Sequence, residues 1–595
     1  MAAQELRWLT YLLTGLGEQP RSPPVLYVDN KAMLALCREH RLEHRTKHIA
    51  LRYFLAHELQ QRGQLRLAYV ASEANTADIF TKALAPGDHQ RFCTLLGLLA
   101  LLCLTGLVTS CSPPLCLWGA TFSSGIRSSD TDAPDIPTPR SYAEAITGPY
   151  SSQWVKRPPG SLPALKARYV AGGFSQRHGV DYFESFSPTP KMTTLRVLLH
   201  VAAQQDYELQ SLDFSTAFLE GSLLEEIWLR HPPGFTESFT TGTQWSLRRP
   251  VYGLRQAPRE WHDTVRTTLA ALGFAPATAD PSLFLRMDTL LPPFYILVYV
   301  DNLVFATADT EALTLVKSEL QKRHTCTDLG ELRSYLGLQI TRDRAHRAIT
   351  LTQSHMVQQS VEPSGPYPEL VGCLMYLMTC TRPDLAYPLS LLPRYVAPVR
   401  HRKVHWDAAM RVLRYLCSTS GMGLVLGGRG PVVLTSHADV SWVDNSAILR
   451  SSQGYTFSLG SGSVSWQSTR SSSVLSSSCE AEIYAGAMAA QELRWLTYLL
   501  TDLVEQPLSP PVLYVDNKAM IALCQEHRLE HRTKYIALRY FLARELQQCG
   551  QLRLAYVATR ANTADVFTKA LPPGDHQRFA TVLGLVPTLL DLLTA

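Results

Sequence analysis

The chain has 595 residues, of which 46% are hydrophobic and 18% are charged, and its formal net charge is +5. This length allows several domains, and the apolar content suits globular cores. The mild positive charge permits a polyanionic partner without requiring one. The twelve cysteines form no C-x-x-C pair and no Cys/His ligand spacing, which argues against zinc and predicts a reduced, intracellular chain. Because no secretory signal pattern opens the sequence, we expect a protein that is not secreted.

The first 98 residues are a second copy of a segment near the end of the sequence. Residues 1–98 align without a gap on residues 488–585, with about 14 mismatches. Two domains under separate selection rarely stay so similar over their whole length, so the pattern indicates a recent duplication or read-through from a neighbouring element. A single repeat of this size is not a solenoid period.

A junction follows the repeat at residues 99–160. Residues 94–108 (TLLGLLALLCLTGLV) are apolar for 15 positions, which is shorter than the ~20 residues that span a bilayer. We therefore expect no stable membrane association. Residues 112–159 are rich in Ser, Pro, Thr and Gly without periodicity, a composition that predicts a disordered linker.

Residues 161–345 alternate helical patterns with short β-rich runs and contain two aspartates at strand ends. Residues 295–305 (YILVYVDNLVF) predict a β-hairpin with Asp301 at its tip, and residues 209–213 (LQSLD) predict a strand that ends in Asp213. Two such aspartates can meet at one edge of a sheet and hold Mg²⁺ for phosphoryl transfer. A lone aspartate at a turn is more often structural, so the pattern alone is weak.

Residues 346–430 are predicted to be mainly helical, and residues 431–586 show a second α/β pattern with four acids at element ends. Runs 432–439 and 511–516 predict strands that end in Asp, residues 454–466 predict a hairpin, and 477–480 predict a helix start with a capping box. A further helix pattern starts at 562–565. Acids at these positions can converge at one sheet edge, where four carboxylates would need cations; they are Asp439, Glu482, Asp516 and Asp565.

Several long motifs in fixed order carry a family resemblance. Residues 166–340 contain KARYVAGGFSQRHGVDYFESFSP, LDFSTAFLEGSLLEEIWLRHPPGF, VYGLRQAPREW, ILVYVDN and DLGELRSYLGLQI. This stretch strongly resembles the reverse transcriptase of copia-type LTR retrotransposons, and the match continues through VGCLMYLMTCTRPDLAY. HADVSW, LSSSCEAEIYA, YVDNKAM and ANTADVFTKAL resemble the RNase H domain that follows the polymerase in this family.

The resemblance implies an α/β (α+β) fold class and a division into five segments. We expect fingers and palm of a reverse transcriptase at 161–345, a helical thumb or connection at 346–430, and an RNase H-like mixed-sheet domain at 431–586. The junction spans 99–160, and residues 1–98 would be the C-terminal half of an RNase H-like domain. That half carries Asp29 and Asp78, the counterparts of Asp516 and Asp565, and lacks the other two acids.

By the same resemblance, Asp213 and Asp301 correspond to the metal-binding catalytic aspartates of the polymerase palm. Phe218 would lie under the incoming sugar, although ordinary core packing explains it as well. Lys166 and Arg168 would contact the triphosphate, with a solvated basic strand as the alternative. Gln256 would line the nucleotide or template pocket.

Three departures from the family pattern bear on polymerase activity. The second aspartate of the family's Tyr-x-Asp-Asp hairpin is Asn302 here, which removes a negative charge beside the metal site. If that carboxylate holds metal, its loss should cost ~10²-fold or more in rate. Residues also look deleted before the fingers motif, and between positions 359 and 363.

For the RNase H domain, the resemblance implies that Asp439, Glu482, Asp516 and Asp565 are catalytic and hold two Mg²⁺ or Mn²⁺ ions. The polymerase site would hold two as well. Glu480 is the alternative to Glu482, which we prefer because it matches the family's Glu-Ile-Tyr-Ala stretch. The implied partners are an RNA template, a DNA primer, an RNA/DNA hybrid and deoxynucleoside triphosphates.

The leading interpretation is therefore an RNA-directed DNA polymerase with an RNase H domain, impaired by Asn302 and by the shortened fingers. A non-catalytic nucleic-acid-binding remnant and a protein with RNase H activity alone are the alternatives. The family resemblance implies an intracellular, cytoplasmic location within virus-like particles.

Overall fold

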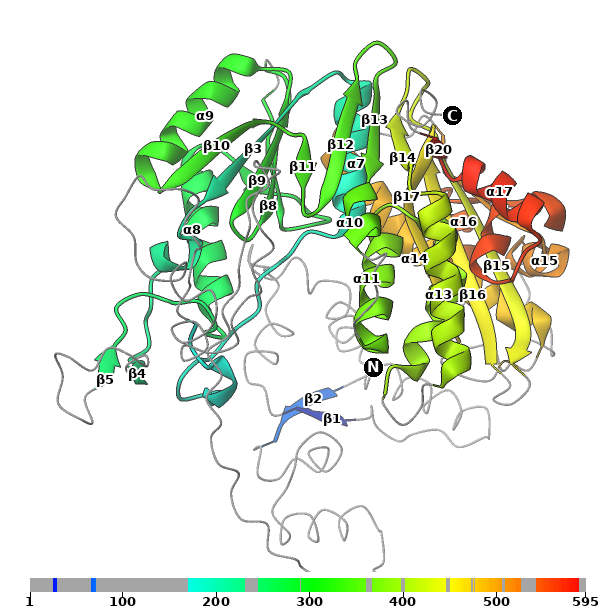
Figure 1. Cartoon of the computed structure of the whole chain (residues 1–595), viewed down its shortest axis with the longest axis horizontal. Helices are drawn as coiled ribbons and strands as arrows, with labels where there is room; N and C mark the ends of the chain where they lie inside the picture. Colours follow the sequence, from blue (N-terminus) through cyan, green and yellow to red (C-terminus); the bar gives the residue numbers. More distant parts are fainter. Residues whose placement is uncertain are drawn as a thin grey trace, which may run out of the picture. The chain divides into compact units, whose positions relative to one another are not determined.

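The computed structural model describes residues 25–28, 66–70, 170–230, 244–288, 291–359, 366–397, 402–445, 450–471, 475, 477–505, 509–525 and 542–587. Contacts divide the chain into two units, Met1–Leu117 and Trp118–Ala595. The described residues form a mixed α/β structure, as the sequence predicts (Figure 1). Within them, no helix combines the length and the apolar character needed to cross a membrane.

The described part of the first unit is a pair of parallel strands. β1 (Val25–Val28) pairs with β2 (Arg66–Tyr69), and Val25 lies opposite Arg66. The junction at 99–160 and the apolar run at 94–108 lie outside the described residues, as do Asp29 and Asp78.

The second unit begins with a six-stranded antiparallel sheet, in the order β10-β3-β9-β8-β7-β6. Side chains of a strand alternate between the two faces of a sheet. In β9, Val304 and Ala306 join the hydrophobic cluster that contains α7, whereas Leu303 and Phe305 join the cluster that contains α8 and α9. The elements are α7 (Met192–Gln204), β3 (Glu208–Phe214), α8 (Ala257–Ala271), β6 (Ala275–Pro276), β7 (Leu283–Arg286), β8 (Phe294–Tyr299), β9 (Asn302–Thr307), α9 (Thr310–Arg323) and β10 (Cys326–Glu331). A separate hairpin joins β4 (Trp228–Arg230) to β5 (Gln244–Ser246).

A five-stranded sheet, in the order β11-β12-β13-β14-β20, and a group of helices come next. The segment 346–430 is helical only in its middle, because strands β13 and β14 occupy its two ends. β20, the last strand of the described chain, returns to pair with β14. The elements are β11 (Ser334–Tyr335), β12 (Leu338–Asp343), β13 (Ala348–Thr352), α10 (Ser354–Gln359), α11 (Tyr367–Cys380), α12 (Ala386–Leu391), α13 (Lys403–Ser418), β14 (Met422–Gly427) and β20 (Leu585–Pro587).

A third sheet, in the order β17-β16-β15-β18-β19, forms the C-terminal region. β15, β16 and β17 are antiparallel, whereas β18 runs parallel to β15 and to β19. The segment after residue 562 differs from the predicted helix: it is a short 3-10 helix, η11, and the α-helix begins only at Pro573. The elements are β15 (Leu434–Asn445), β16 (Arg450–Leu459), β17 (Gly462–Arg470), α14 (Ser478–Asp502), β18 (Val512–Val515), α15 (Lys518–Gln525), α16 (Leu542–Gln548), β19 (Arg553–Tyr556), η11 (Thr563–Phe567) and α17 (Pro573–Val582).

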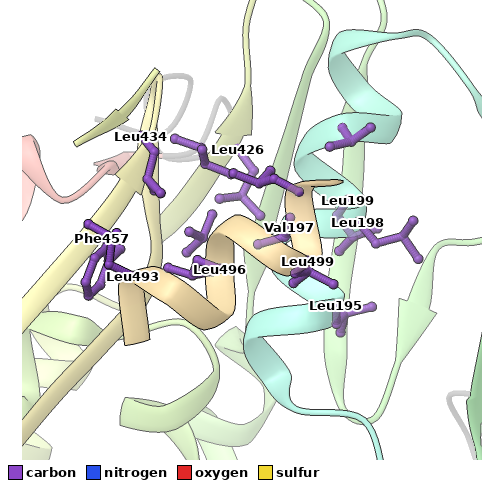
Figure 2. Close-up of a cluster of buried hydrophobic side chains, with 14 of the residues drawn as sticks. Leu195, Val197, Leu198, Leu199, Leu426, Leu434, Phe457, Leu493, Leu496 and Leu499 are labelled. Carbon is purple, nitrogen blue, oxygen red and sulfur yellow. The ribbon is translucent and has the colours of Figure 1, made fainter. Parts of the chain in front are cut away.

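One hydrophobic core connects the first and third sheets. Leu195, Val197 and Leu198 of α7 belong to the same buried cluster as Leu496 and Leu499 of α14. Figure 2 shows these side chains between the two helices and the neighbouring strands. Because each of these residues is almost fully buried, removal of apolar area from water stabilises the contact between the two regions.

A buried arginine adds a polar connection to this core. Arg196 of α7 is only 3% exposed. Its Nε donates to the carbonyl oxygen of Val464 at 2.7 Å, and its Nη1 donates to those of Thr379 and Cys380 at 2.7 and 3.0 Å. The guanidinium also lies 3.9 Å from the ring centre of Trp466. Burial lowers the pKa of Arg196 to about 9, so these carbonyl contacts offset a real desolvation cost.

We predict that Arg196→Met lowers the free energy of unfolding by roughly 2–4 kcal/mol, because it leaves buried carbonyl oxygens without donors. Denaturant unfolding followed by tryptophan fluorescence measures this change. Arg411→Met is the matched control, since Arg411 lies on the exposed face of α13 and should shift stability by less than ~0.5 kcal/mol. Equal effects of the two substitutions would contradict the role given to Arg196.

Candidate active sites

The two polymerase-motif aspartates lie at the same place in the first sheet. Asp213 is in β3, and its partner across the β3–β9 pairing is Asn302. Asp301 directly precedes Asn302, and its carbonyl oxygen accepts a hydrogen bond from the Phe214 amide at 2.8 Å. The β8–β9 turn consists of Val300 and Asp301, so the predicted hairpin is present with Asp301 at its tip. Asp213 and Asp301 are therefore brought to neighbouring positions at one edge of the β3–β9 pair.

Asn302 begins β9 instead of taking part in the turn. Its side-chain amide nitrogen donates a hydrogen bond to Oδ1 of Asp301 at 3.1 Å. The amide therefore holds the Asp301 carboxylate, but it adds no negative charge of its own. In this respect the site has one charge fewer than a pair of adjacent aspartates would provide.

Trp261 supports both aspartate-bearing segments from the interior, a contact that the sequence patterns did not reveal. Its indole N–H donates to the carbonyl oxygen of Val300 at 2.5 Å. Its ring meets Phe214 edge-on, with ring centres 4.8 Å apart. Val300 has φ of 53°, which is costly for a β-branched residue. The hydrogen bond from Trp261 thus holds a strained residue immediately before Asp301.

Of the four predicted nucleotide-binding residues, the structure describes Phe218 and Gln256. Phe218 lies in a 3-10 turn after β3, partly buried, with its ring centre 4.8 Å from that of Tyr252. Gln256 is 1% exposed, and its amide bonds to Gln176 at 2.9 Å and to the Asp181 carbonyl at 3.0 Å. Its amide is thus engaged within the protein and does not project into an open pocket. Lys166 and Arg168 lie outside the described residues.

Three of the four acids predicted in the C-terminal region form a compact cluster. Asp439 lies within β15, Glu482 lies in the second turn of α14, and Asp516 follows β18. Each offers a carboxylate oxygen, and these oxygens all lie within 4.8 Å of one another. Asp439 and Glu482 are 1% and 8% exposed. Among the described residues, the cluster includes Glu482 and leaves out Glu480.

Local structure explains why these acids meet. The Ser477 hydroxyl accepts from the Glu480 amide at 3.1 Å and starts α14, as the capping pattern predicts. Asn517 likewise accepts from the Met520 amide at 2.9 Å, so the chain turns into α15 directly after Asp516. The end of β18 and the start of α14 therefore bring Asp516 and Glu482 to Asp439. The prediction that a strand ends at Asp439 is wrong, because β15 continues to Asn445.

The fourth acid, Asp565, is linked to the cluster through a lysine. Nζ of Lys569 lies 2.8 Å from Oδ1 of Asp565 and 3.3 Å from Oδ2 of Asp439. The hydroxyl of Thr568 also donates to Oδ2 of Asp439. The sequence patterns missed Lys569 and Thr568, although both stand in the ANTADVFTKAL motif.

The electrostatics of the cluster favour protonation when no other cation is bound. Burial raises the pKa of Glu482 to about 9, and Asp439 and Asp516 add to the effect. Burial and Asp439 raise the pKa of Asp565 to about 6. Burial also raises the pKa of Asp439 against the opposing influence of Lys569 and Thr568. One lysine does not compensate four carboxylates, which is the charge pattern that suits divalent cations with oxygen ligands.

Comparison with known proteins identifies relatives for most of the chain. A family model described as reverse transcriptase (RNA-dependent DNA polymerase) matches residues 151–366. A retrovirus-related Pol polyprotein from transposon RE2 of Arabidopsis thaliana is 34% identical over 458 residues, covering 72% of this chain and 31% of the relative. A putative transposon Ty5-1 protein of Saccharomyces cerevisiae is 30% identical over 312 residues, covering 47% of this chain and all of the relative.

Among solved structures, the protease-reverse transcriptase of prototype foamy virus is 12% identical, with a TM-score of 0.18, covering 66% of this chain and 48% of that one. The chain spans about a third of the length of the plant Pol polyproteins it matches. The family model and the identity with transposon relatives agree with the motifs found in the sequence. The chain therefore belongs to the copia-type retrotransposon Pol family, with the reverse transcriptase match in its middle region.

Proposed function

We propose that this chain acts on RNA and DNA as a reverse transcriptase with an RNase H domain, and that its RNase H site is the better preserved of the two. The observation that carries the proposal is the cluster of Asp439, Glu482 and Asp516, whose oxygens lie within 4.8 Å of one another. Buried carboxylates with raised pKa values are costly, and such costs concentrate at functional sites.

The four acids and Thr568 would have different roles in hydrolysis of the RNA strand. Two bound Mg²⁺ or Mn²⁺ ions would supply an activated water and would stabilise the departing 3′-oxygen of the RNA strand. Asp439, Glu482 and Asp516 would hold the ions, with Asp565 completing the set. The Thr568 hydroxyl orients the Asp439 carboxylate through its hydrogen bond.

The proposed substrates follow from the two sites. The RNase H site would take an RNA/DNA hybrid and recognise it by phosphates, 2′-hydroxyls and groove shape, without reading a base sequence. The palm would take an RNA template, a DNA primer and deoxynucleoside triphosphates, with Asp213 and Asp301 holding two metal ions. In that reading Phe218 lies under the incoming sugar, and Lys166 and Arg168 contact the triphosphate. Gln256, whose buried amide is bonded to Gln176 and to the Asp181 carbonyl, would support the nucleotide pocket from within the protein.

A second candidate function is a protein that retains RNase H activity while the palm only binds nucleic acid. The contact that favours it is the hydrogen bond from the neutral Asn302 amide to Asp301. The Asn302 amide stands where the family pattern has a carboxylate. The polymerase site therefore has less negative charge with which to hold metal ions.

We predict that Glu482→Gln reduces cleavage of a labelled RNA/DNA hybrid by at least ~10²-fold, because it removes a buried metal-holding charge. Glu480→Gln is the matched control, two residues earlier on the same helix, and should change the rate by less than about threefold. Single-turnover cleavage assays measure both. If the two variants lost activity equally, or if only Glu480→Gln did, the assignment of Glu482 would be wrong.

We predict that Asn302→Asp raises the rate of primer extension on an RNA template by ~10²-fold, because it restores a carboxylate beside Asp301. Extension by the native chain should exceed that of Asp213→Ala, which serves as the inactive control. Failure of Asn302→Asp to extend the primer faster than Asp213→Ala would reject polymerase activity and favour the second candidate function.

We predict that the metal-free protein loses stability as the pH rises between about 5 and about 9. The folded state keeps a proton on Glu482 up to its pKa of about 9, whereas the unfolded chain releases it near the ordinary value of 4.5. Because the folded state binds more protons in this window, ionisation favours unfolding. Melting temperatures in EDTA should therefore fall with pH, and excess Mg²⁺ should flatten the slope. A Glu482→Gln variant with the same slope as the native chain would contradict this explanation.

A further inference from the structure

The ammonium group of Lys569 lies between two of the four acids of the C-terminal region, Asp439 and Asp565. Lys569 follows η11 and lies four residues after Asp565, so its side chain reaches back over the preceding turn. The ammonium contacts Asp565 at 2.8 Å and both oxygens of Asp439, at 3.3 and 3.5 Å. Two of the four acids therefore share this one ammonium group.

The carboxylates of the four acids thus form two separate positions at which a cation can be bound. The first lies among Asp439, Glu482 and Asp516, whose oxygens form a compact group. The second lies between Asp439 and Asp565, and Asp565 does not belong to the compact group. Asp439 faces both places, and the Lys569 ammonium already fills the second.

We propose that Lys569 is an internal competitor for the second divalent ion of the RNase H site. The inference rests on the proposed function, because it takes the four acids as metal ligands. Lys569 compensates Asp439 and Asp565 while only the first place is filled, and its ammonium leaves when the second ion enters. The two ions therefore bind in order, the first tightly and the second weakly.

The surroundings of Lys569 allow this exchange. Its side chain is 32% exposed, whereas those of Asp439 and Asp565 are 1% and 9% exposed. The ammonium therefore has a route to solvent on a flexible stem, while the carboxylates stay fixed. The Thr568 hydroxyl continues to hold Asp439 after the lysine leaves. A tethered ammonium also has a high effective concentration at the site, so it weakens binding of a competing ion.

Calorimetric titration of the full chain with Mn²⁺ tests the order of binding. The Asp213→Ala background removes the contribution of the palm. The native RNase H site should show a second dissociation constant at least ~10²-fold weaker than the first. Lys569→Met should tighten the second by at least about tenfold and change the first by less than about threefold. Lys569→Arg, which keeps the charge, should resemble the native residue. An unchanged or weaker second constant in Lys569→Met would overturn the proposal.

Two further measurements separate the possible failures. If Asp516→Asn binds Mn²⁺ as tightly as the native site does, the proposed function is wrong, regardless of the result for the Lys569 variants. In EDTA, Lys569→Met should melt at a lower temperature than the native chain, because two buried acids lose their cation, and excess Mn²⁺ should restore the melting temperature. A destabilisation that persists in excess Mn²⁺, including failure to fold, would make Lys569 a structural residue and overturn the proposal. Lys322→Met, an exposed site on α9, controls for the loss of one positive charge.

Discussion

The contact between helices α7 and α14 is the constraint on which both candidate sites depend. α7 packs against the face of the first sheet opposite α8 and α9, and so supports β3, which carries Asp213, and the β8–β9 hairpin, which carries Asp301. α14 carries Glu482 near its start, while Leu496 and Leu499 in its later turns pack in the core with α7. Interiors packed this closely transmit displacement, so neither site is mechanically independent of the other. A mutation in this core should disturb both.

Local sequence signals predicted much of what the structure contains. The strand before Asp213, the β8–β9 hairpin and the caps at Ser477 and Asn517 depend on residues within a few positions, where turn chemistry and periodicity act directly. Apart from the ion pair of Lys569 with Asp565, four residues away, the contacts that were missed join distant segments. Trp261 reaches Val300 across 39 residues, and Lys569 reaches Asp439 across 130. No periodicity encodes such contacts, because they exist only after the sheets have assembled.

The two sites reduce the repulsion between neighbouring carboxylates in different ways. At the first sheet, one of the three neighbouring positions Asp213, Asp301 and Asn302 is neutral, and the Asn302 amide donates to Asp301. In the C-terminal region all four acids are present, and a lysine and a threonine hydroxyl compensate part of their charge. The expected helix after residue 562 is instead the 3-10 turn η11, capped by Asn562. That tighter turn places Lys569 where it can contact both Asp565 and Asp439.

The pairing of β1 with β2 has a consequence for where the register of these strands is specified. Val25 lies opposite Arg66 just as Val512 lies opposite Arg553, so the two copies of the repeat pair their strands in one register. In the C-terminal copy, β18 also pairs with β15, a strand that lies outside the repeated segment 488–585. The parallel register of this strand pair is therefore specified by residues within the repeated segment itself. The pattern of side chains along two paired strands sets their register, and this pattern is nearly the same in both copies, so the same local pairing is specified twice in one chain.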